Sequence, residues 1–233
     1  MEKKIHRAEE RGKVEAGWLR SRYSFSFARY YNPERMGFGL LRVLNDDIIE
    51  PGRGFDTHPH ENMEIVTVVL EGALAHKDNS GGEGVIKPGE VQVMSAGSGV
   101  MHSEFNNSKK EKAKLLQIWI ETKEDGIKPR YGQKAFRLGR NKLNVLASGE
   151  KGKGLYIHQD AVISRALLDK GKEVKYNISG KDNGAYVFVI EGRARIADEE
   201  LGERDAIGVW NADSLEVSAP SKADVLILDV PMM

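Results

Sequence analysis

Short apolar runs alternate with turn-forming residues along most of the chain. Runs rich in β-branched and other apolar residues occupy 64–70, 91–94 and 115–120. Turn-forming residues recur at short spacing before and between these runs: Pro51-Gly52, Glu71-Gly72, Ser80-Gly81-Gly82, Pro88-Gly89 and Gly97-Ser98-Gly99. This spacing is typical of an all-β sandwich or barrel. Residues 161–168 are the best candidate for a helix, but their pattern suits a strand equally well.

One of these patterns occurs twice. Residues 65–78 read IVTVVLEGALAHKD and residues 185–198 read AYVFVIEGRARIAD, with the Glu-Gly pair and the final Asp at the same places. A strand, a tight glycine turn and a returning strand therefore recur at a constant offset. We predict two related β-barrel domains, with residues 1–135 forming the first and residues 136–233 the second.

Composition narrows the chemistry. The chain has 233 residues, no cysteine, and equal numbers of basic and acidic residues, 35 of each. The balanced charge gives no reason to expect binding to nucleic acid or to a membrane. The charged N-terminus and the lack of a long apolar run predict neither a signal peptide nor a membrane helix. Without thiolates, any metal must be held by histidine and carboxylate. The absence of cysteine also fits the cytoplasm, where we expect the protein to be a monomer.

Two pairs of residues have the spacing of neighbours on one face of a strand. Side chains at i and i+2 share a face, so His58 and His60 point the same way, as do His102 and Glu104. If the two strands are adjacent, three imidazoles and one carboxylate converge and can hold one divalent transition metal with open positions. Glu64 follows His60 by four residues, which in a continuous strand places it on the same face, so it is an alternative carboxylate ligand. Pro59 predicts a strand edge, start or bulge.

The other three histidines have weaker surroundings. His6 lies in a charged terminus, His158 has no partner motif, and His76 follows the Gly72 turn on what looks like a surface strand. An isolated histidine on a strand is most often solvated or hydrogen-bonded, so we predict that none of them is a ligand.

The repeat also predicts where the metal is absent. Carried across the repeat offset, His58 and His60 fall on Ile178 and Gly180. Aligning the Gly89-Glu90 turn with Arg204-Asp205 places His102 and Glu104 on Val217 and Ala219. None of these four residues can bind a metal. The second barrel is therefore expected to lack one and to pack against the first.

Longer motifs resemble a known family. Gly52-x5-His58-x-His60-x3-Glu64-x7-Gly72 is similar to the first cupin motif, and Gly89-x5-Ser95-x-Gly97-x4-His102-x3-Asn106 to the second. Residues 3–231 resemble the pirin family of bicupins, in the bacterial branch with quercetin 2,3-dioxygenase-like activity. The matching stretches include Ser24-Phe25-Ser26-Phe27-Ala28, Asn45-Asp46-Asp47, Thr57-His58-Pro59-His60, His102-Ser103-Glu104, Gln117-Ile118-Trp119-Ile120 and His158-Gln159-Asp160-Ala161.

The resemblance implies specific roles. It implies two cupin (jelly-roll) barrels and a metal held by His58, His60, His102 and Glu104, so that Glu64 takes a supporting role. Imidazole with carboxylate in octahedral geometry favours Fe²⁺ as the metal, with Ni, Co, Mn, Cu or Zn as alternatives. The resemblance implies a flavonol such as quercetin and O2 as substrates. Glu104 would then accept the flavonol proton. Candidate pocket-wall residues are Phe25, Phe27, Met94 and Met101, although plain core packing explains these equally well.

Two other functions fit the same ligands. Some pirins resemble regulatory proteins that bind a protein partner in response to the redox state of the metal. Such a regulator needs no turnover and no pocket beside the metal. Alternatively, the metal only stabilises the barrel, in which case protein ligands should saturate it.

Overall fold

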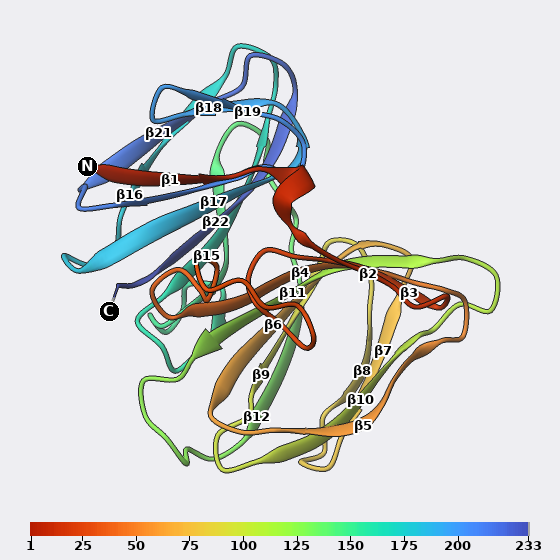
Figure 1. Ribbon diagram of the computed structural model, residues 1–233. Helices are drawn as coiled ribbons and strands as arrows, with labels where there is room; N and C mark the ends of the chain where they lie inside the picture. The colour runs from red at the N-terminus through yellow and green to blue at the C-terminus, as the bar shows by residue number, and fades with distance from the viewer. Residues whose placement is uncertain (233) are drawn as a thin grey trace.

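The computed structural model describes residues 1–232 and consists almost entirely of strands arranged as two barrels (Figure 1). The only helix in this range is a short 3-10 turn, Ala8–Glu10. The prediction of an all-β fold with two barrels is confirmed, and the ambiguous segment 161–168 forms a strand, β15 (Val162–Leu168). No helix among these residues is long and apolar enough to cross a membrane.

The first barrel combines a seven-stranded sheet, in the order β12-β9-β6-β11-β4-β3-β2, with a four-stranded sheet, β5-β10-β7-β8. Its strands are β2 (Gly12–Glu15), β3 (Leu19–Tyr23), β4 (Leu41–Ile49), β5 (Gly54–His60), β6 (Met63–Glu71), β7 (Leu74–Asp78), β8 (Glu83–Ile86), β9 (Glu90–Ser95), β10 (Val100–Asn106), β11 (Ala113–Glu121) and β12 (Arg130–Ala135). The runs predicted at 64–70, 91–94 and 115–120 lie within β6, β9 and β11.

The second barrel repeats this plan. A seven-stranded sheet, β1-β20-β17-β22-β15-β13-β14, faces a four-stranded sheet, β16-β21-β18-β19. Its other strands are β1 (Glu2–His6), β13 (Leu143–Ser148), β14 (Leu155–Tyr156), β16 (Glu173–Asn177), β17 (Asn183–Gly192), β18 (Ala194–Ile196), β19 (Glu199–Leu201), β20 (Ala206–Trp210), β21 (Ser214–Ser218) and β22 (Ala223–Pro231).

The N-terminal strand belongs to the second barrel by hydrogen bonding. β1 pairs antiparallel with β20, from Glu2 opposite Trp210 to His6 opposite Ala206, and Figure 1 shows it beside the C-terminal strands. The chain then crosses to the first barrel at β2. The predicted division of the chain between residues 135 and 136 remains a proposal. β1 lies before this division but belongs to a sheet of the second barrel, so the chain connects the two barrels twice.

The internal repeat appears as two equivalent hairpins. β6 turns into β7 at Gly72 and β17 turns into β18 at Gly192, with φ of 73° and 79°. A Cβ on Gly72 would lie 2.5 Å from the Lys112 carbonyl oxygen, and one on Gly192 would clash with the Lys222 carbonyl. Both turns therefore need glycine for its positive φ and for the close approach of the next strand.

The two seven-stranded sheets pack face to face between the barrels. Alternate residues of β6, such as Val66 and Val68, join Tyr186 and Phe188 of β17 in one buried cluster. The intervening residues of β17, Val187 and Val189, point the other way and fill the second barrel. Since each strand alternates between the two sides of its sheet, one sheet serves both the shared core and the barrel interior.

The interiors of the two barrels differ in chemistry. Aliphatic side chains fill the second barrel, including Val217 and Ala219 at positions where the repeat predicts no metal ligand. Within residues 1–232, groups of side chains that could hold a metal occur only in the first barrel. The candidate site therefore lies in one barrel.

Candidate metal centre

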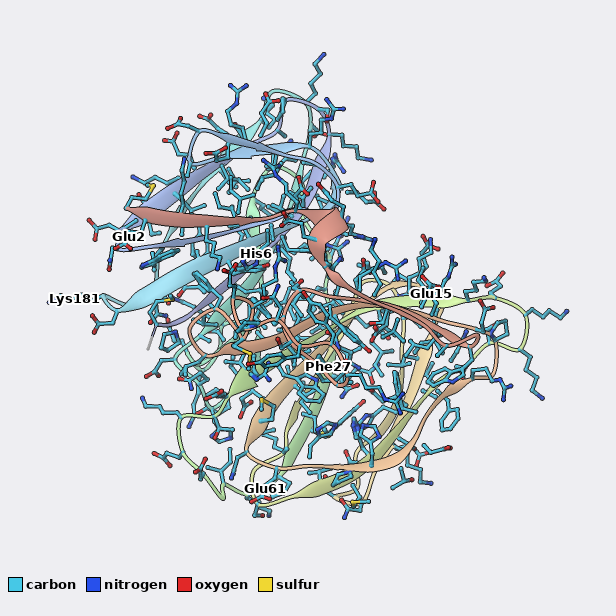
Figure 2. All side chains as sticks on the ribbon, viewed as in Figure 1. Glu2, His6, Glu15, Phe27, Glu61 and Lys181 are labelled. Atoms are coloured by element: carbon cyan, nitrogen blue, oxygen red, sulfur yellow. The ribbon has the colours of Figure 1, made fainter. Side chains whose placement is uncertain are left out.

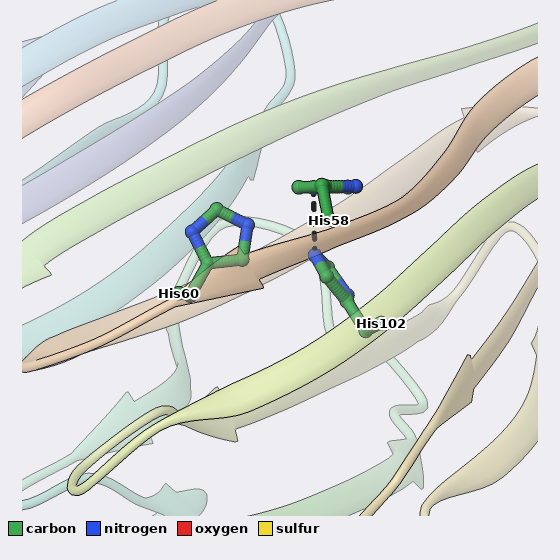
Figure 3. Close-up of side chains that lie close together, drawn as sticks. All are labelled: His58, His60 and His102. Carbon is green, nitrogen blue, oxygen red and sulfur yellow. Dashed lines mark hydrogen bonds between the residues drawn. The ribbon is translucent and has the colours of Figure 1, made fainter.

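Two paired strands bring the predicted histidines together. β5 is the edge strand of the four-stranded sheet, as expected from Pro59, and it pairs antiparallel with β10. His58 lies directly opposite His102, and their Nε2 atoms are 3.0 Å apart (Figure 3). The strands that carry His58 and His102 are thus neighbours, as a shared metal site requires.

His60 completes a cluster of three imidazoles. Its ring centroid lies 4.9 Å from that of His58 and 4.7 Å from that of His102. One ring nitrogen from each histidine falls within 4.8 Å of the others. Figure 3 shows the three side chains converging from β5 and β10.

The cluster favours uncharged imidazole. Burial lowers the pKa of His60 to about 4 and that of His102 to about 2, because a charged ring would lose its hydration there. Charge on the neighbouring histidines would lower both pKa values further by repulsion. His58 Nδ1 lies 2.7 Å from the Asp56 carbonyl oxygen and donates a hydrogen bond to it. The other ring nitrogen of His58, Nε2, faces Nε2 of His102 and is the one that a metal would bind. Converging lone pairs are suited to a cation.

Glu104 lies on the same strand but beyond an irregularity. The pairing of β10 with β5 shifts register between His102 and Glu104, so Glu104 faces Phe55. Its Oε2 accepts a hydrogen bond of 2.7 Å from Gln117 Nε2, whereas Oε1 is buried and has no hydrogen-bond partner among residues 1–232. Burial raises the pKa of the Glu104 carboxyl to about 7.

The four predicted ligands are not equally close. A carboxylate oxygen of Glu104 lies within 4.8 Å of ring nitrogens of His102 and His76, but it is not within that distance of all the nitrogens that His58, His60 and His102 bring together. All four predicted ligands nevertheless line the same cavity. The unpartnered Oε1 of Glu104 is the atom available to a cation there.

Glu64 lies on the other side of its sheet. The chain turns between His60, the last residue of β5, and Met63, the first of β6. The side chain of Glu64 is fully buried and accepts a hydrogen bond of 2.8 Å from Ser95 Oγ, while its neighbour Ile65 lines the cavity. The expectation that Glu64 shares the face of His60 is wrong, because the turn interrupts the strand alternation.

His76 was expected on a surface strand and is instead 2% exposed, in contact with His102. β7, which carries it, is an inner strand of the four-stranded sheet and pairs with β10. Spacing along the chain could not reveal this, although the His76–Asp78 pair has the same i, i+2 separation as the ligand pairs. His6 and His158 lie elsewhere, beside Tyr186 and Tyr156 respectively.

A cavity of about 440 Å³ opens beside the imidazole cluster. Aromatic rings form much of its wall, with Phe27 edge-on to Trp119 and Trp18 edge-on to Phe55, each pair 5.2 Å apart. Trp119 is itself 4.7 Å from the His60 ring. Figure 2 shows Phe27 at the side of the first barrel that faces the second.

The cavity also has a polar strip that sequence spacing did not indicate. Asn45, Asp47 and Gln117 line it, from the paired strands β4 and β11. Burial raises the pKa of Asp47 to about 7, although Ser21 Oγ donates a hydrogen bond to it. Asn45 and Asp47 are two residues apart on β4, the spacing of the ligand pairs, and this spacing could have indicated them from the sequence.

Of the four candidate wall residues, only Phe27 lines the cavity. Phe25 packs in the shared core, Met94 packs with Ile65 and Val100, and Met101 is 39% exposed. For these three, core packing or surface exposure is the better explanation.

The donor set fits a divalent metal. Three uncharged imidazoles and one buried carboxylate oxygen without a partner are ligands of intermediate hardness, typical of sites for first-row transition metals. The aromatic cavity leaves room for a ligand beside them. Binding one cation would compensate the burial of Glu104 and satisfy the converging nitrogens.

Known proteins are similar to this chain over nearly its whole length. The chain is 41% identical over 227 residues to quercetin 2,3-dioxygenase of Escherichia coli K12, covering 97% of this chain and 98% of the relative. A pirin-like protein of Caulobacter vibrioides is 40% identical over 94% of this chain and 95% of its own. The crystal structure of the bacterial pirin YhhW from Escherichia coli in complex with nickel(II) superimposes with a TM-score of 0.94 at 39% identity, covering 100% of both chains.

Two family models match successive parts of the chain. The model described as pirin matches residues 4–120, and the model described as quercetinase C-terminal cupin domain matches residues 145–230. Together with the full-length similarity to the curated relatives, these matches confirm the resemblance noted in the motifs. The chain belongs to the pirin family.

Proposed function

We propose that this protein is a metal-dependent dioxygenase that opens flavonols such as quercetin with O2. The observation that carries the proposal is the imidazole cluster beside an aromatic-walled cavity of about 440 Å³. Cavities of this size and character are typical of small-molecule sites. The names of the curated relatives support the same substrate class.

We assign His58, His60, His102 and Glu104 as the metal ligands and Fe²⁺ as the metal. The nickel(II) complex of a relative supports a divalent ion without deciding which one this chain uses. When bound, a redox-capable divalent ion supplies the Lewis acidity and electron transfer that reaction of a flavonol with O2 requires. The three histidines hold it as uncharged rings, through one nitrogen each.

Glu104 has a second task in this proposal. Its Oε1 would accept the proton of the flavonol hydroxyl when that oxygen is not bound to the metal, while Gln117 holds Oε2 in place. In the metal-free protein burial raises the pKa of this carboxyl to about 7, and a cation beside it would favour the carboxylate form that accepts a proton. The flat rings of Trp119, Phe27 and Phe55 position the flavonol and exclude water from the reacting face.

The cavity also bears on the alternative function. A regulator that signals through a protein partner needs no enclosed space beside its metal, and a purely structural metal needs none either. The aromatic wall and the polar strip of Asn45, Asp47 and Gln117 are instead suited to a flat ligand carrying hydroxyl groups. We therefore favour the enzyme.

The test is an aerobic assay on protein reconstituted with one metal at a time. Fe²⁺-loaded wild type should consume quercetin and release carbon monoxide. His102→Ala should lose both bound metal, measured by elemental analysis, and turnover. His158→Ala removes a histidine outside the cavity and should retain both. Unchanged turnover in His102→Ala would overturn the ligand assignment, and absence of turnover with every metal would overturn the dioxygenase.

A further inference from the structure

Behind His102, away from the cavity, a chain of hydrogen-bonding groups leads to a buried carboxylate. The Nδ1 atom of His102 lies 3.4 Å from Nδ1 of His76. The Nε2 atom of His76 lies 2.9 Å from Oδ2 of Asp78. His102 thus faces the other cavity histidines through Nε2 and this chain of groups through Nδ1.

The sheet builds this arrangement by the same alternation that builds the site. β7 pairs with β10 so that Asp78 lies opposite His102 and His76 opposite Glu104. His76 and Asp78 are two residues apart and point to the same side. The side chains of both are fully buried, so water does not compete for their hydrogen bonds.

Asp78 is held as a charged acceptor. Its Oδ1 accepts hydrogen bonds from the Ser80 amide, the Ser80 hydroxyl and the Gly82 amide, at 2.7 to 2.9 Å. Burial alone would raise the pKa of Asp78, but the hydrogen bonds from His76, Ser80 and Gly82 together lower it. The other carboxylate oxygen, Oδ2, accepts a hydrogen bond from Nε2 of His76.

This fixes one direction for every proton in the chain of groups. His76 donates from Nε2 to Asp78, so its Nδ1 carries a lone pair. That lone pair accepts the proton on Nδ1 of His102, and the lone pair of His102 is left on Nε2, toward the cavity. Tyr131 stacks on the His76 ring with centroids 4.9 Å apart and planes 25° apart, which restrains the ring from turning.

We propose that Asp78 and His76 are positioning residues that lock His102 in the metal-binding tautomer and strengthen its Nε2 as a ligand. This inference rests on the metal site proposed above. A carboxylate behind a ligating histidine raises the basicity of the ring, and loss of such partners typically weakens metal binding by about 10- to 100-fold. His58, by contrast, is oriented only by the neutral carbonyl of Asp56.

Asp78→Asn tests the direction of the protons while keeping the shape. The amide oxygen can still accept from Ser80 and Gly82, but the amide NH2 would donate to Nε2 of His76. His76 would then carry its proton on Nδ1 and would favour the tautomer of His102 with a proton on Nε2, where the metal binds. We expect the dissociation constant for nickel(II), measured by competition with a chromophoric chelator, to rise about 10- to 100-fold.

A second measurement does not depend on affinity. In the zinc(II)-loaded wild type, the ¹⁵N shifts of the histidine side chains should show protons on Nδ1 of His102 and on Nε2 of His76. His76→Phe removes the acceptor, keeps an aromatic ring beside Tyr131, and should weaken nickel(II) binding in the same direction. It also carries the test if Asp78→Asn does not fold.

The matched control is Glu64→Gln, the same carboxyl-to-amide change at a buried site facing away from the cavity. It should leave the nickel(II) dissociation constant within twofold of wild type. Unchanged nickel(II) affinity in Asp78→Asn and His76→Phe, or a proton on Nδ1 of His76 in the wild type, would overturn the proposed roles of Asp78 and His76. Failure of the wild type to bind metal would instead overturn the proposed site.

Discussion

At the scale of single residues, the first barrel buries carboxyl groups where uncharged side chains would be more stable in the absence of a metal. Asp47 and Glu104 are both carboxyl groups inside the cavity wall, each less than 4% exposed, and burial raises the pKa of both to about 7. Without a cation, each favours its neutral form when the protein is folded. The site is therefore organised for a positive charge that binding would supply.

Asp47 gives a pH dependence whose sign is fixed. Its folded pKa of about 7 exceeds the ordinary value of 3.8, so between these values the folded protein binds the extra proton. Protonated Asp47 therefore contributes its full stabilisation of the folded state below about pH 4. This contribution, up to about 4 kcal/mol, is lost as the pH rises through 7. Asp47→Asn, which can still accept from Ser21, should therefore gain stability relative to metal-free wild type between pH 4.5 and pH 8.

Urea unfolding of both metal-free proteins at the two pH values measures this gain. Other titrating groups are common to the two proteins and largely cancel in the difference. A difference that does not change with pH would mean that Asp47 is ionised in the folded protein.

At the scale of strands, the site depends on how closely β5 and β10 approach. Gly54 lies opposite Phe105, next to the register shift that precedes Glu104. A Cβ at Gly54 would lie 2.5 Å from the Phe105 Cα and would clash with the Glu104 carbonyl oxygen. Both obstacles are backbone, so neither can turn aside.

Gly54→Ala should therefore push the two strands apart and separate His58 from His102. We expect a loss of about 1 to 3 kcal/mol in the free energy of unfolding and at least about tenfold weaker nickel(II) binding. Gly132→Ala on β12 is the control, because its new Cβ would have no neighbour closer than 3.4 Å. Chemical unfolding and chelator competition measure the two effects, and equal behaviour of the two variants would contradict this account.

Strand periodicity explains which parts of the site were predictable. His58, His60, His102 and Glu104 form i, i+2 pairs within single strands, so their shared faces follow from local geometry. His76 depends on the register of β7 against β10, which no short-range pattern specifies. Glu64 was misplaced because the turn at Glu61-Asn62, where Asn62 has a φ of 48°, ends one strand and begins another.

At the scale of the whole molecule, the second barrel contributes packing rather than ligands. Tyr186, Phe188 and Leu226 share one buried cluster with Val66 and Leu116 of the first barrel. Backbone hydrogen bonds also tie the two halves together, since the N-terminal strand β1 pairs with β20 of the second barrel and the Leu40 amide donates to the Pro231 carbonyl. Neither barrel can expose its half of this core without a large loss of burial, so we expect them to unfold together.

Metal binding in the first barrel should therefore protect the second. A ligand at 100 times its dissociation constant stabilises the folded state by about 2.7 kcal/mol, which slows amide exchange through global unfolding about 100-fold. Nickel(II) should produce this slowing in β17 and β22, although neither strand contributes a proposed ligand. Hydrogen exchange followed by mass spectrometry measures it, and His102→Ala should show no change. Slowing confined to β5, β6, β10 and β11 would mean that the barrels open independently and that the shared cluster does not couple them.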